Sequence, residues 1–307
     1  MKTKIIVLAV LAVAAGAFAY SRLHKAVPLA GSNAAHTDLP YVGKSVDNIP
    51  EQKSAPAEDI PKGNVATNMS AQPVEFIAIP GGKFTMGTGT NEKGFKDAKP
   101  PHEVVIKTFD LAKTAVTVEQ YAECVMKGGC KEPAAGDSCN WGLADRQLHP
   151  VNCVSWAQAS QYAKFMGARL PTEAEFEYAA AGGRKQKYPW GNEEATCGKA
   201  VMSDSKGVFG CGTNATMPVC SKPAGNTAQG LCDMAGNVFQ WVQDKYRDTY
   251  IGAPADGRAV EGAGPLRVMR GGSFNCVDAL PLRTGFRGRV DPGYRDAGIG
   301  FRLAKSR

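Results

Sequence analysis

The chain has 307 residues, 43% of them hydrophobic and 21% charged, which is enough for one large domain or two small ones. Its 36 basic residues against 29 acidic ones give a formal net charge of +7. The excess is spread along the chain without a block of lysine and arginine. This pattern is typical of a solubility feature, so we expect no nucleic-acid partner.

Residues 1–25 have the pattern of a secretory signal peptide. Two lysines precede an apolar run from Ile5 to Phe18, and the residues at 17–19, Ala-Phe-Ala, offer a small-residue cleavage site. The run is short for a full membrane span, and three basic residues follow it within residues 20–25. An uncleaved N-terminal anchor is the alternative. We expect an exported protein, periplasmic or secreted, that contacts a membrane only through this segment.

Residues 26–73 are rich in Pro, Ala, Ser, Asn and Asp and show little apolar periodicity. This composition predicts a disordered or extended linker, because it buries too little apolar surface to offset the entropy of folding. Composition changes at residue 74, and we expect one domain over 74–307. Its first segment, VEFIAIPGGKFTMGT at 74–88, alternates around Pro80-Gly81-Gly82, which predicts a β-hairpin.

Three later segments carry helix start and stop signals. In each, a serine or threonine is followed three residues later by Gln or Glu, the spacing of a capping box, and a glycine ends the apolar pattern. From Gly183 onward no long helix is indicated, and Gly, Asn, Asp and Pro are frequent. We therefore expect an α+β domain with little regular secondary structure, whose long loops are stapled by disulfides. The capping pairs are Thr117 with Gln120, Ser155 with Gln158, and Thr172 with Glu175.

The nine cysteines of the chain are the candidates for these staples. In an exported protein, cysteines form disulfides more often than metal sites, and no Cys-x-x-Cys pair of the kind found in zinc ribbons is present. Short loops favour pairing between neighbours, and the odd count leaves one thiol over. The predicted disulfides are Cys124–Cys130, Cys139–Cys153, Cys197–Cys211 and Cys220–Cys232.

Five ordered motifs make the chain resemble the formylglycine-generating enzyme, or sulfatase-modifying factor, family from about Val74 to Lys305. The resemblance implies a C-type-lectin-like fold with few helices and long loops. It does not by itself imply catalysis, because similar proteins include copper oxidases as well as surface and scaffold proteins. The motifs are FIAIPGGKFTMGT, the run HPVNCVSWAQASQYAKFMGARLPTEAEFEYAAAGG, YPWGN, GLCDMAGNVFQWVQD, and the closing pair RVMRGGSF and GFRLA.

The enzyme of this family oxidises a sulfatase cysteine to formylglycine with O₂ and with Cu(I) held by two cysteines, a donor pair that suits a soft ion of low coordination number. By resemblance, Cys276 is the first of these cysteines, three residues after Ser273. Pro281 stands at the position of the second and has no atom that can bind a metal. We therefore expect Cys276 to be a free thiol at the active-site position, and we do not expect copper to bind.

The residues around Cys276 have two interpretations each. Ser273 is a candidate catalytic residue by resemblance, or a serine at the glycine-rich start of a core strand that bonds the backbone. Arg270 and Arg283 would lower the pKa of the Cys276 thiol if they lie close to it, whereas burial would raise that pKa. The three arginines between 283 and 289 either line a groove or form salt bridges.

A second implied site lies in the segment CDMAGNVFQW. The matching loop of the enzymes binds calcium, and residue by residue the ligands here would be the Asp233 carboxylate, the Gly236 and Val238 carbonyls and the Gln240 amide. Gln240 stands where the family usually has Glu, so one negative charge is lost. Asp233 stands where the family frequently has Asn, and it restores that charge. The alternative is a tight Gly-Asn turn that places Trp241 in the core.

Two functions from different classes follow from these residues. The first is an exported, non-catalytic binding or scaffold module with a protein or peptide partner, because Pro281 replaces the second copper cysteine. The alternative is a formylglycine-generating oxidase, or a related oxidase, that acts through Cys276.

Overall fold

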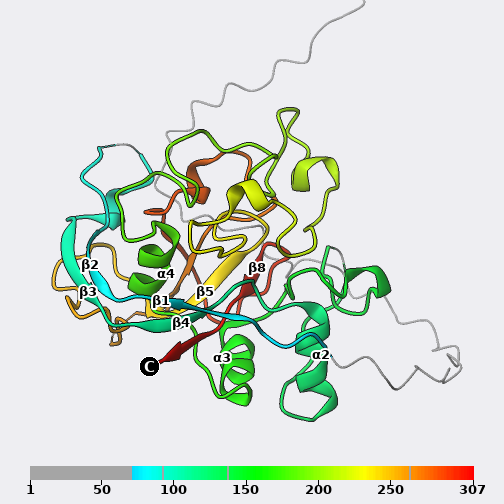
Figure 1. The fold of residues 1–307 in the computed structure, drawn as a ribbon. Coiled ribbons are helices and arrows are strands. Elements are labelled where there is room, and N and C mark those ends of the chain that lie inside the picture. Colours follow the sequence, from blue (N-terminus) through cyan, green and yellow to red (C-terminus); the bar gives the residue numbers. More distant parts are fainter. Residues whose placement is uncertain (1–70, 92, 137, 263) are drawn as a thin grey trace, which may run out of the picture. The chain divides into compact units, whose positions relative to one another are not determined.

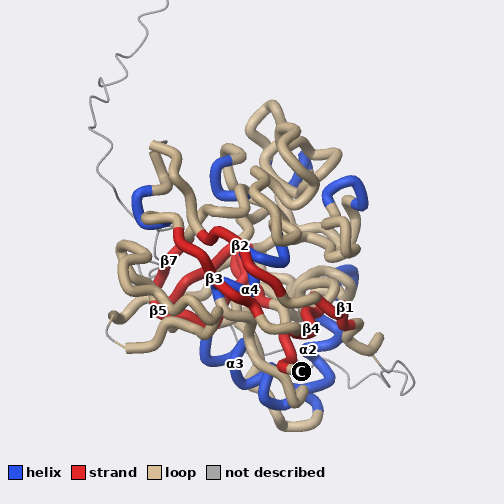
Figure 2. The backbone as a smooth tube through the Cα atoms, turned by 60° about the vertical axis from the view of Figure 1, so that its left-hand side comes forward, coloured by secondary structure: helices blue, strands red, loops and turns tan. Residues whose placement is uncertain are grey.

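The computed structural model describes residues 71–91, 93–136, 138–262 and 264–307. The predicted leader or anchor at 1–25, and the linker up to residue 70, lie outside these ranges. Within them, none of the helices combines the length and the apolar character needed to span a bilayer. Loops and turns, tan in Figure 2, make up most of the backbone, which agrees with the prediction of little regular secondary structure.

The strands of the described residues form three sheets, and the four-stranded sheet carries the candidate site. Its order is β7-β6-β5-β8, with β5 antiparallel to β6 and parallel to β8. The other two sheets have the orders β1-β4-β9 and β2-β3 (Figure 1). The strand bounds are β1 Phe76–Ile79, β2 Gly82–Met86, β3 His102–Ile106, β4 Phe109–Ala112, β5 Phe239–Lys245, β6 Arg267–Arg270, β7 Gly288–Val290, β8 Ile299–Phe301 and β9 Ala304–Ser306.

The predicted β-hairpin at 74–88 is wrong in its pairing. β1 and β2 occupy this segment, but β1 pairs with β4 and β2 pairs with β3. The two strands separate at Gly81, whose N–H donates to Thr108 Oγ1 (3.1 Å) and whose Cβ, if present, would lie 2.5 Å from the Ile106 carbonyl oxygen. The glycine therefore permits a close approach of two backbones and does not form a hairpin turn.

The α-helices of the described residues begin at the predicted capping boxes. Thr117 Oγ1 accepts from the Gln120 N–H, and the Gln120 side chain accepts in return from the Thr117 N–H; the boxes at Ser155 and Thr172 are closed in the same way. These bonds satisfy N–H groups that the helix itself leaves without partners. The helices are α2 Val118–Met126, α3 Trp156–Phe165 and α4 Glu173–Ala180, and the 3₁₀ turns are η1 Lys96–Ala98, η2 Ala144–Arg146, η3 Phe209–Gly212, η4 Pro223–Gly225 and η5 Leu280–Leu282.

Four disulfides cross-link the loops in the pairs expected from short spacing. Each closes a loop of 6 to 14 residues, and a staple of this length contributes about 2–3 kcal/mol, chiefly by restricting the unfolded chain. Their number indicates an oxidising environment. The bonds are Cys124–Cys130, Cys139–Cys153, Cys197–Cys211 and Cys220–Cys232, and Cys276 is a free, buried thiol.

Two buried apolar clusters surround the sheets. One contains Tyr121 of α2 and Tyr162 of α3, whose rings stack 5.3 Å apart, together with Trp241 of β5. Trp241 is fully buried, and its indole N–H donates to the Val154 carbonyl (3.0 Å). The other cluster packs Phe176 of α4 against β2 and β3. The Gly-Asn turn before β5 therefore does place Trp241 in the core.

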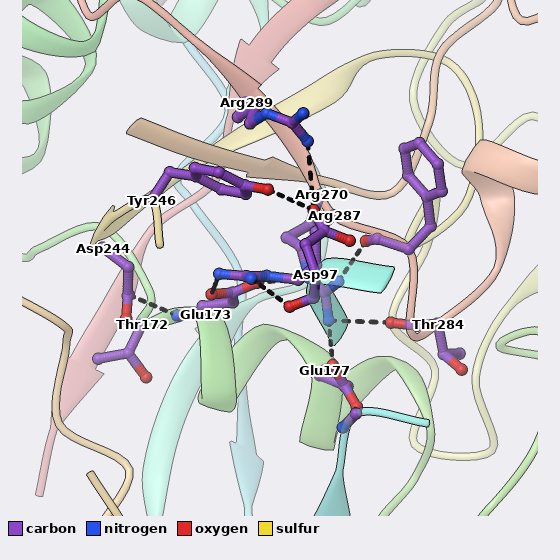
Figure 3. A network of polar contacts seen from close by, with 12 residues as sticks. Asp97, Thr172, Glu173, Glu177, Asp244, Tyr246, Arg270, Thr284, Arg287 and Arg289 are labelled. Atoms are coloured by element: carbon purple, nitrogen blue, oxygen red, sulfur yellow. Dashed lines mark hydrogen bonds and ion pairs between the residues drawn. The ribbon is translucent and has the colours of Figure 1, made fainter. Parts of the chain in front are cut away.

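A network of buried ion pairs joins α4 to the four-stranded sheet (Figure 3). Arg287, next to β7, donates from Nε to Glu173 Oε1 (2.7 Å) and from Nη2 to Glu173 Oε2 (3.0 Å). Arg270, the last residue of β6, pairs through Nη2 with Glu177 Oε2, and its Nε lies 3.8 Å from Glu173 Oε1. All four side chains are at most 5% exposed.

Further polar residues extend the network to other elements. Asp244 of β5 accepts from the Glu173 N–H (2.7 Å) in the first turn of α4. On η1, Asp97 Oδ2 accepts from the Tyr246 hydroxyl (2.8 Å) and from Arg289 Nη1 (3.3 Å). Arg287 and Arg289 therefore both form salt bridges, which is one of the two interpretations considered for them.

The charge of Glu173 depends on its partners. Burial alone would raise the pKa of this carboxyl, but the attraction of Arg287 and then of Arg270 outweighs burial and lowers it. A buried ion pair offsets its desolvation only while it is complete, and removal of one partner leaves an uncompensated charge.

We expect Glu173→Gln to lower the free energy of unfolding by about 3–5 kcal/mol, because Arg287 then loses its buried counter-charge. Urea denaturation with the disulfides intact measures the change. The matched control is Glu103→Gln, which breaks a pair with Lys83 whose side chains are 68% and 65% exposed and should cost less than about 1 kcal/mol. Equal losses in the two variants would contradict a special role for the buried network.

Candidate functional site

Cys276 lies in a tight turn directly after β6. The strand ends at Arg270, and Gly271 and Gly272 follow with φ of 97° and 73°, a region that favours glycine. A Cβ on Gly272 would also lie 3.1 Å from the Pro281 carbonyl oxygen. The turn closes where the Cys276 N–H donates to the Ser273 carbonyl (3.2 Å). RGGSF therefore ends a core strand instead of starting one.

The structure brings the two predicted sites side by side. β5 and β6 pair antiparallel, with Gln240 opposite Arg270. The loop before β5 is bonded to the turn after β6: the Gly236 N–H donates to the Gly271 carbonyl (2.8 Å), and the Phe274 N–H donates to the Asn237 carbonyl (2.9 Å). The predicted calcium loop therefore supports the turn that holds Cys276.

Ser273 contacts the thiol directly. Its N–H donates to Cys276 Sγ (3.3 Å), and its Oγ lies 3.5 Å from the same sulfur. The Ser273 hydroxyl donates its one proton to Asn275 Oδ1 (2.6 Å), which leaves the Cys276 thiol as the donor toward Ser273 Oγ. Ser273 and Cys276 are 0% and 1% exposed. The Ser273 hydroxyl therefore contacts the side chains of Asn275 and Cys276. The expected hydrogen bond from this serine to the backbone is not formed by its hydroxyl.

Burial decides the protonation of Cys276. It raises the pKa of the thiol to about 11, against the weaker effect of the hydrogen bonds from Ser273. The Arg270 guanidinium is directed at Glu177 and at the Thr284 carbonyl, and the Arg283 guanidinium lies 5.6 Å from the centre of the Phe95 ring. Of the two opposing effects considered for this thiol, burial therefore prevails.

The surroundings of Cys276 do not fit a two-thiolate copper site. Pro281 lies in the η5 turn, five residues after Cys276. The other eight cysteines are in disulfides, and no group of three or more His, Cys, Asp or Glu side chains among the described residues is arranged to hold a metal ion. A protonated, buried thiol, with a proline at the position of the second cysteine, offers Cu(I) no pair of soft ligands.

One of the oxygens predicted to bind calcium, Gln240 Oε1, is held by a buried guanidinium instead. Gln240 Oε1 accepts from Arg302 Nε (2.5 Å), and the Asp233 carbonyl accepts from Arg302 Nη2 (3.3 Å) and from Gln240 Nε2 (2.8 Å). The Asp233 carboxylate accepts from the Cys220 N–H (2.9 Å). A calcium ion bound to Gln240 would lie beside this cation, so the predicted ligands, as they are arranged here, do not fit calcium.

Sequence reasoning missed two residues of the site, Asn275 and Arg302. Arg302 is fully buried, and burial lowers its pKa to about 10, which leaves it charged at neutral pH. Its sequence signal is an arginine inside the apolar run GFRLA, because such a residue needs buried acceptors. Asn275 carries no comparable signal.

Because the Cys276 thiol has a pKa of about 11, about one thiol in a thousand is ionised at pH 8, and we expect the folded chain to resist iodoacetamide there. Alkylation should accelerate as the pH rises toward 11 or when the chain unfolds, and mass spectrometry measures it. Val277→Cys is the control, since Val277 is 76% exposed and a cysteine there should react readily. Equal rates at positions 276 and 277 would contradict a buried thiol.

We expect the melting temperature of the chain to be the same in millimolar calcium as in excess chelator, because Gln240 Oε1 already accepts a hydrogen bond from the charged Arg302 side chain. Gln240→Ala should lower it equally under both conditions, since the buried Arg302 loses an acceptor. Differential scanning calorimetry measures both. A calcium-dependent rise that Asp233→Ala abolishes would establish the calcium site instead.

Comparison with known proteins agrees with this geometry. The model of the sulfatase-modifying factor enzyme 1-like domain matches residues 61–307. A formylglycine-generating enzyme of Streptomyces coelicolor is 32% identical over 74% of this chain and 88% of its own length. A serine/threonine-protein kinase, pkn1 of Chlamydia caviae, is 34% identical over 75% of this chain, but the chain spans only 38% of that kinase.

Among solved structures, PvdO from Pseudomonas aeruginosa is similar at 30% identity with a TM-score of 0.65, over 76% of this chain and 94% of that one. The Treponema denticola variable protein 1, at 24% identity and a TM-score of 0.59, shares the fold. With its predicted α+β, C-type-lectin-like architecture confirmed, the chain belongs to the sulfatase-modifying factor enzyme 1-like domain family.

Proposed function

We propose that this chain is an exported, non-catalytic member of its family that binds a protein or peptide partner as a scaffold module. The observation that carries the proposal is the state of Cys276, a protonated and buried thiol without a second thiol at position 281. A family fold can persist when the chemistry of its site is lost, because packing and chemistry depend on different residues.

The loop surface near Cys276 supports a binding role. Val277, the next residue, is 76% exposed, and Phe209 is 38% exposed. Phe209 precedes Gly210, whose N–H donates to the Phe274 carbonyl (2.9 Å), so both apolar side chains belong to segments that meet at this turn. Disulfide Cys197–Cys211 restrains the second segment, and a restrained loop loses less entropy when it binds a partner.

Export is supported by the disulfides and by the predicted leader. Four bonds that join eight of the nine cysteines are typical of proteins that fold in an oxidising compartment. Whether the N-terminal segment is cleaved or remains as an anchor does not change the role proposed for the domain.

We expect the purified chain to bind Cu(I) no more tightly than its Cys276→Ser variant in competition with a strong chelator, because a single protonated thiol is a poor Cu(I) site. It should also leave a peptide with the sulfatase sequence Cys-x-Pro-x-Arg unoxidised in air, as measured by mass spectrometry. Stoichiometric copper binding that requires Cys276, together with aldehyde formation, would establish the oxidase instead.

Pro281→Cys is the complementary variant of this experiment. It restores the second thiol at the family position, in a turn whose backbone lies against Gly272. Tight copper binding in this variant alone would show that the missing cysteine, and not a rearranged fold, removed the metal site.

A further inference from the structure

We propose that a pocket of about 160 Å³ beside the end of α4 binds an acidic side chain of the peptide partner. One wall is the turn after α4, at 184–187, the second is the segment 283–285, and the third is the end of β2 with the residues that follow it. The pocket is smaller than the roughly 300 Å³ at which sites for whole small molecules begin, so it suits one side chain. The inference rests on the peptide-binding function proposed above and names the chemistry of the partner.

The described residues that line this pocket are strongly basic. They include four cationic side chains, and the one acidic side chain among them, Glu177, is already occupied. Glu177 Oε1 accepts from the Gly87 N–H (2.7 Å), and its Oε2 pairs with Arg270 (Figure 3). This carboxyl therefore does not compensate the cations of the lining, which are Arg184, Lys185, Lys187 and Arg283.

Two of these cations have no counter-charge within the described part of the chain. Arg184 and Lys185 are exposed and form no ion pair with any described residue. By contrast, Lys187 pairs with Glu194, whose side chain is 72% exposed. Uncompensated cations beside a pocket attract an anion to it, and salt weakens the attraction because these charges are exposed.

The basic wall of the pocket is fixed before a ligand binds. The Arg184 N–H donates to the Ala181 carbonyl just after α4 (3.0 Å). Thr284 joins the opposite wall to this turn, since its N–H donates to the Lys187 carbonyl (3.0 Å) and its Oγ1 donates to the Gln186 carbonyl (2.7 Å). The backbone that carries the cations is therefore already in place, which lowers the entropic cost of binding.

These features favour a glutamate or aspartate side chain over the other classes of side chain. Guanidinium and ammonium groups only donate hydrogen bonds and a carboxylate only accepts them, and charge-assisted bonds of this kind are stronger than neutral ones. An arginine, such as the one in the sulfatase sequence Cys-x-Pro-x-Arg, would meet like charges here. An apolar side chain would leave the cations without a counter-charge.

The test is an NMR titration of the full chain with the blocked peptide Gly-Ser-Ala-Glu-Ala-Ser-Gly and with versions that carry Gln or Arg at the central position. We expect the Glu peptide to shift the amide resonances of 184–187 and 283–285 saturably. The Gln and Arg peptides should bind at least fivefold more weakly, because they lack the anion. Inorganic phosphate at the same concentration should not displace the Glu peptide; displacement would indicate a site for small anions and overturn the assignment to a peptide.

Two double variants separate the charge at the pocket from the net charge of the chain. Arg184→Gln with Lys185→Gln should weaken binding of the Glu peptide at least fivefold and leave the melting temperature unchanged, since neither side chain has an ion-pair partner among the described residues. Lys131→Gln with Lys206→Gln removes the same charge from exposed positions that do not line the pocket, and should leave binding unchanged.

Three results would overturn the proposal: equal affinity for the Glu and Gln peptides, no saturable binding of the Glu peptide, or equal losses in the two double variants. None of them concerns copper binding or oxidation at Cys276. A failure of this inference is therefore distinguishable from a failure of the non-catalytic function.

Discussion

The buried ion pairs between α4 and the four-stranded sheet are the interaction on which the rest of the structure depends. They join residues that are far apart in the sequence, since Glu173 and Arg287 are 114 positions apart and Glu177 and Arg270 are 93 apart. Arg270 is also the last residue before the two glycines of the Cys276 turn. Because Glu177 holds its guanidinium, the network anchors the residue from which that turn starts.

Arg302, at the predicted calcium loop, likewise joins segments that are far apart in the sequence. It donates to the Ala112 carbonyl at the end of β4 (2.9 Å) and the Cys232 carbonyl (2.7 Å) as well as to Gln240, and so it joins the central strand of one sheet to the loop before β5. In a domain with so little regular secondary structure, many loop carbonyls must find donors. A guanidinium has five N–H groups and can satisfy several of them, and here it cross-links the loops without a metal ion.

Fold and chemistry are therefore separable in this chain. The disulfides, the capping boxes and the buried arginines do not involve the position of the second cysteine, which lies in a half-buried turn. A proline at 281 is compatible with that turn, because its fixed φ suits a 3₁₀ segment. The site keeps the contact between Ser273 and Cys276, but it holds a protonated thiol where copper chemistry would need two thiolates.

Residues close together in the sequence determined a large part of the result. The capping boxes, such as Thr117 with Gln120, act over three positions, and the disulfides close loops of 14 residues or fewer, so both could be predicted without a fold. The motifs over residues 74–305 were enough to predict the family and the α+β, C-type-lectin-like architecture. Pro281 could be identified as the missing ligand from its place in one of these motifs.

The tertiary structure alone decided which strands pair and how Cys276 is charged. β1 and β2 have the spacing of a hairpin, but each pairs with a later strand, because pairing depends on partners from elsewhere in the chain. The two arginines near Cys276 in sequence are directed elsewhere, and burial sets the pKa of the thiol. Burial and Coulomb interactions depend on distance in space, and for Arg302 and Gln240, 62 positions apart, only the fold supplies that distance.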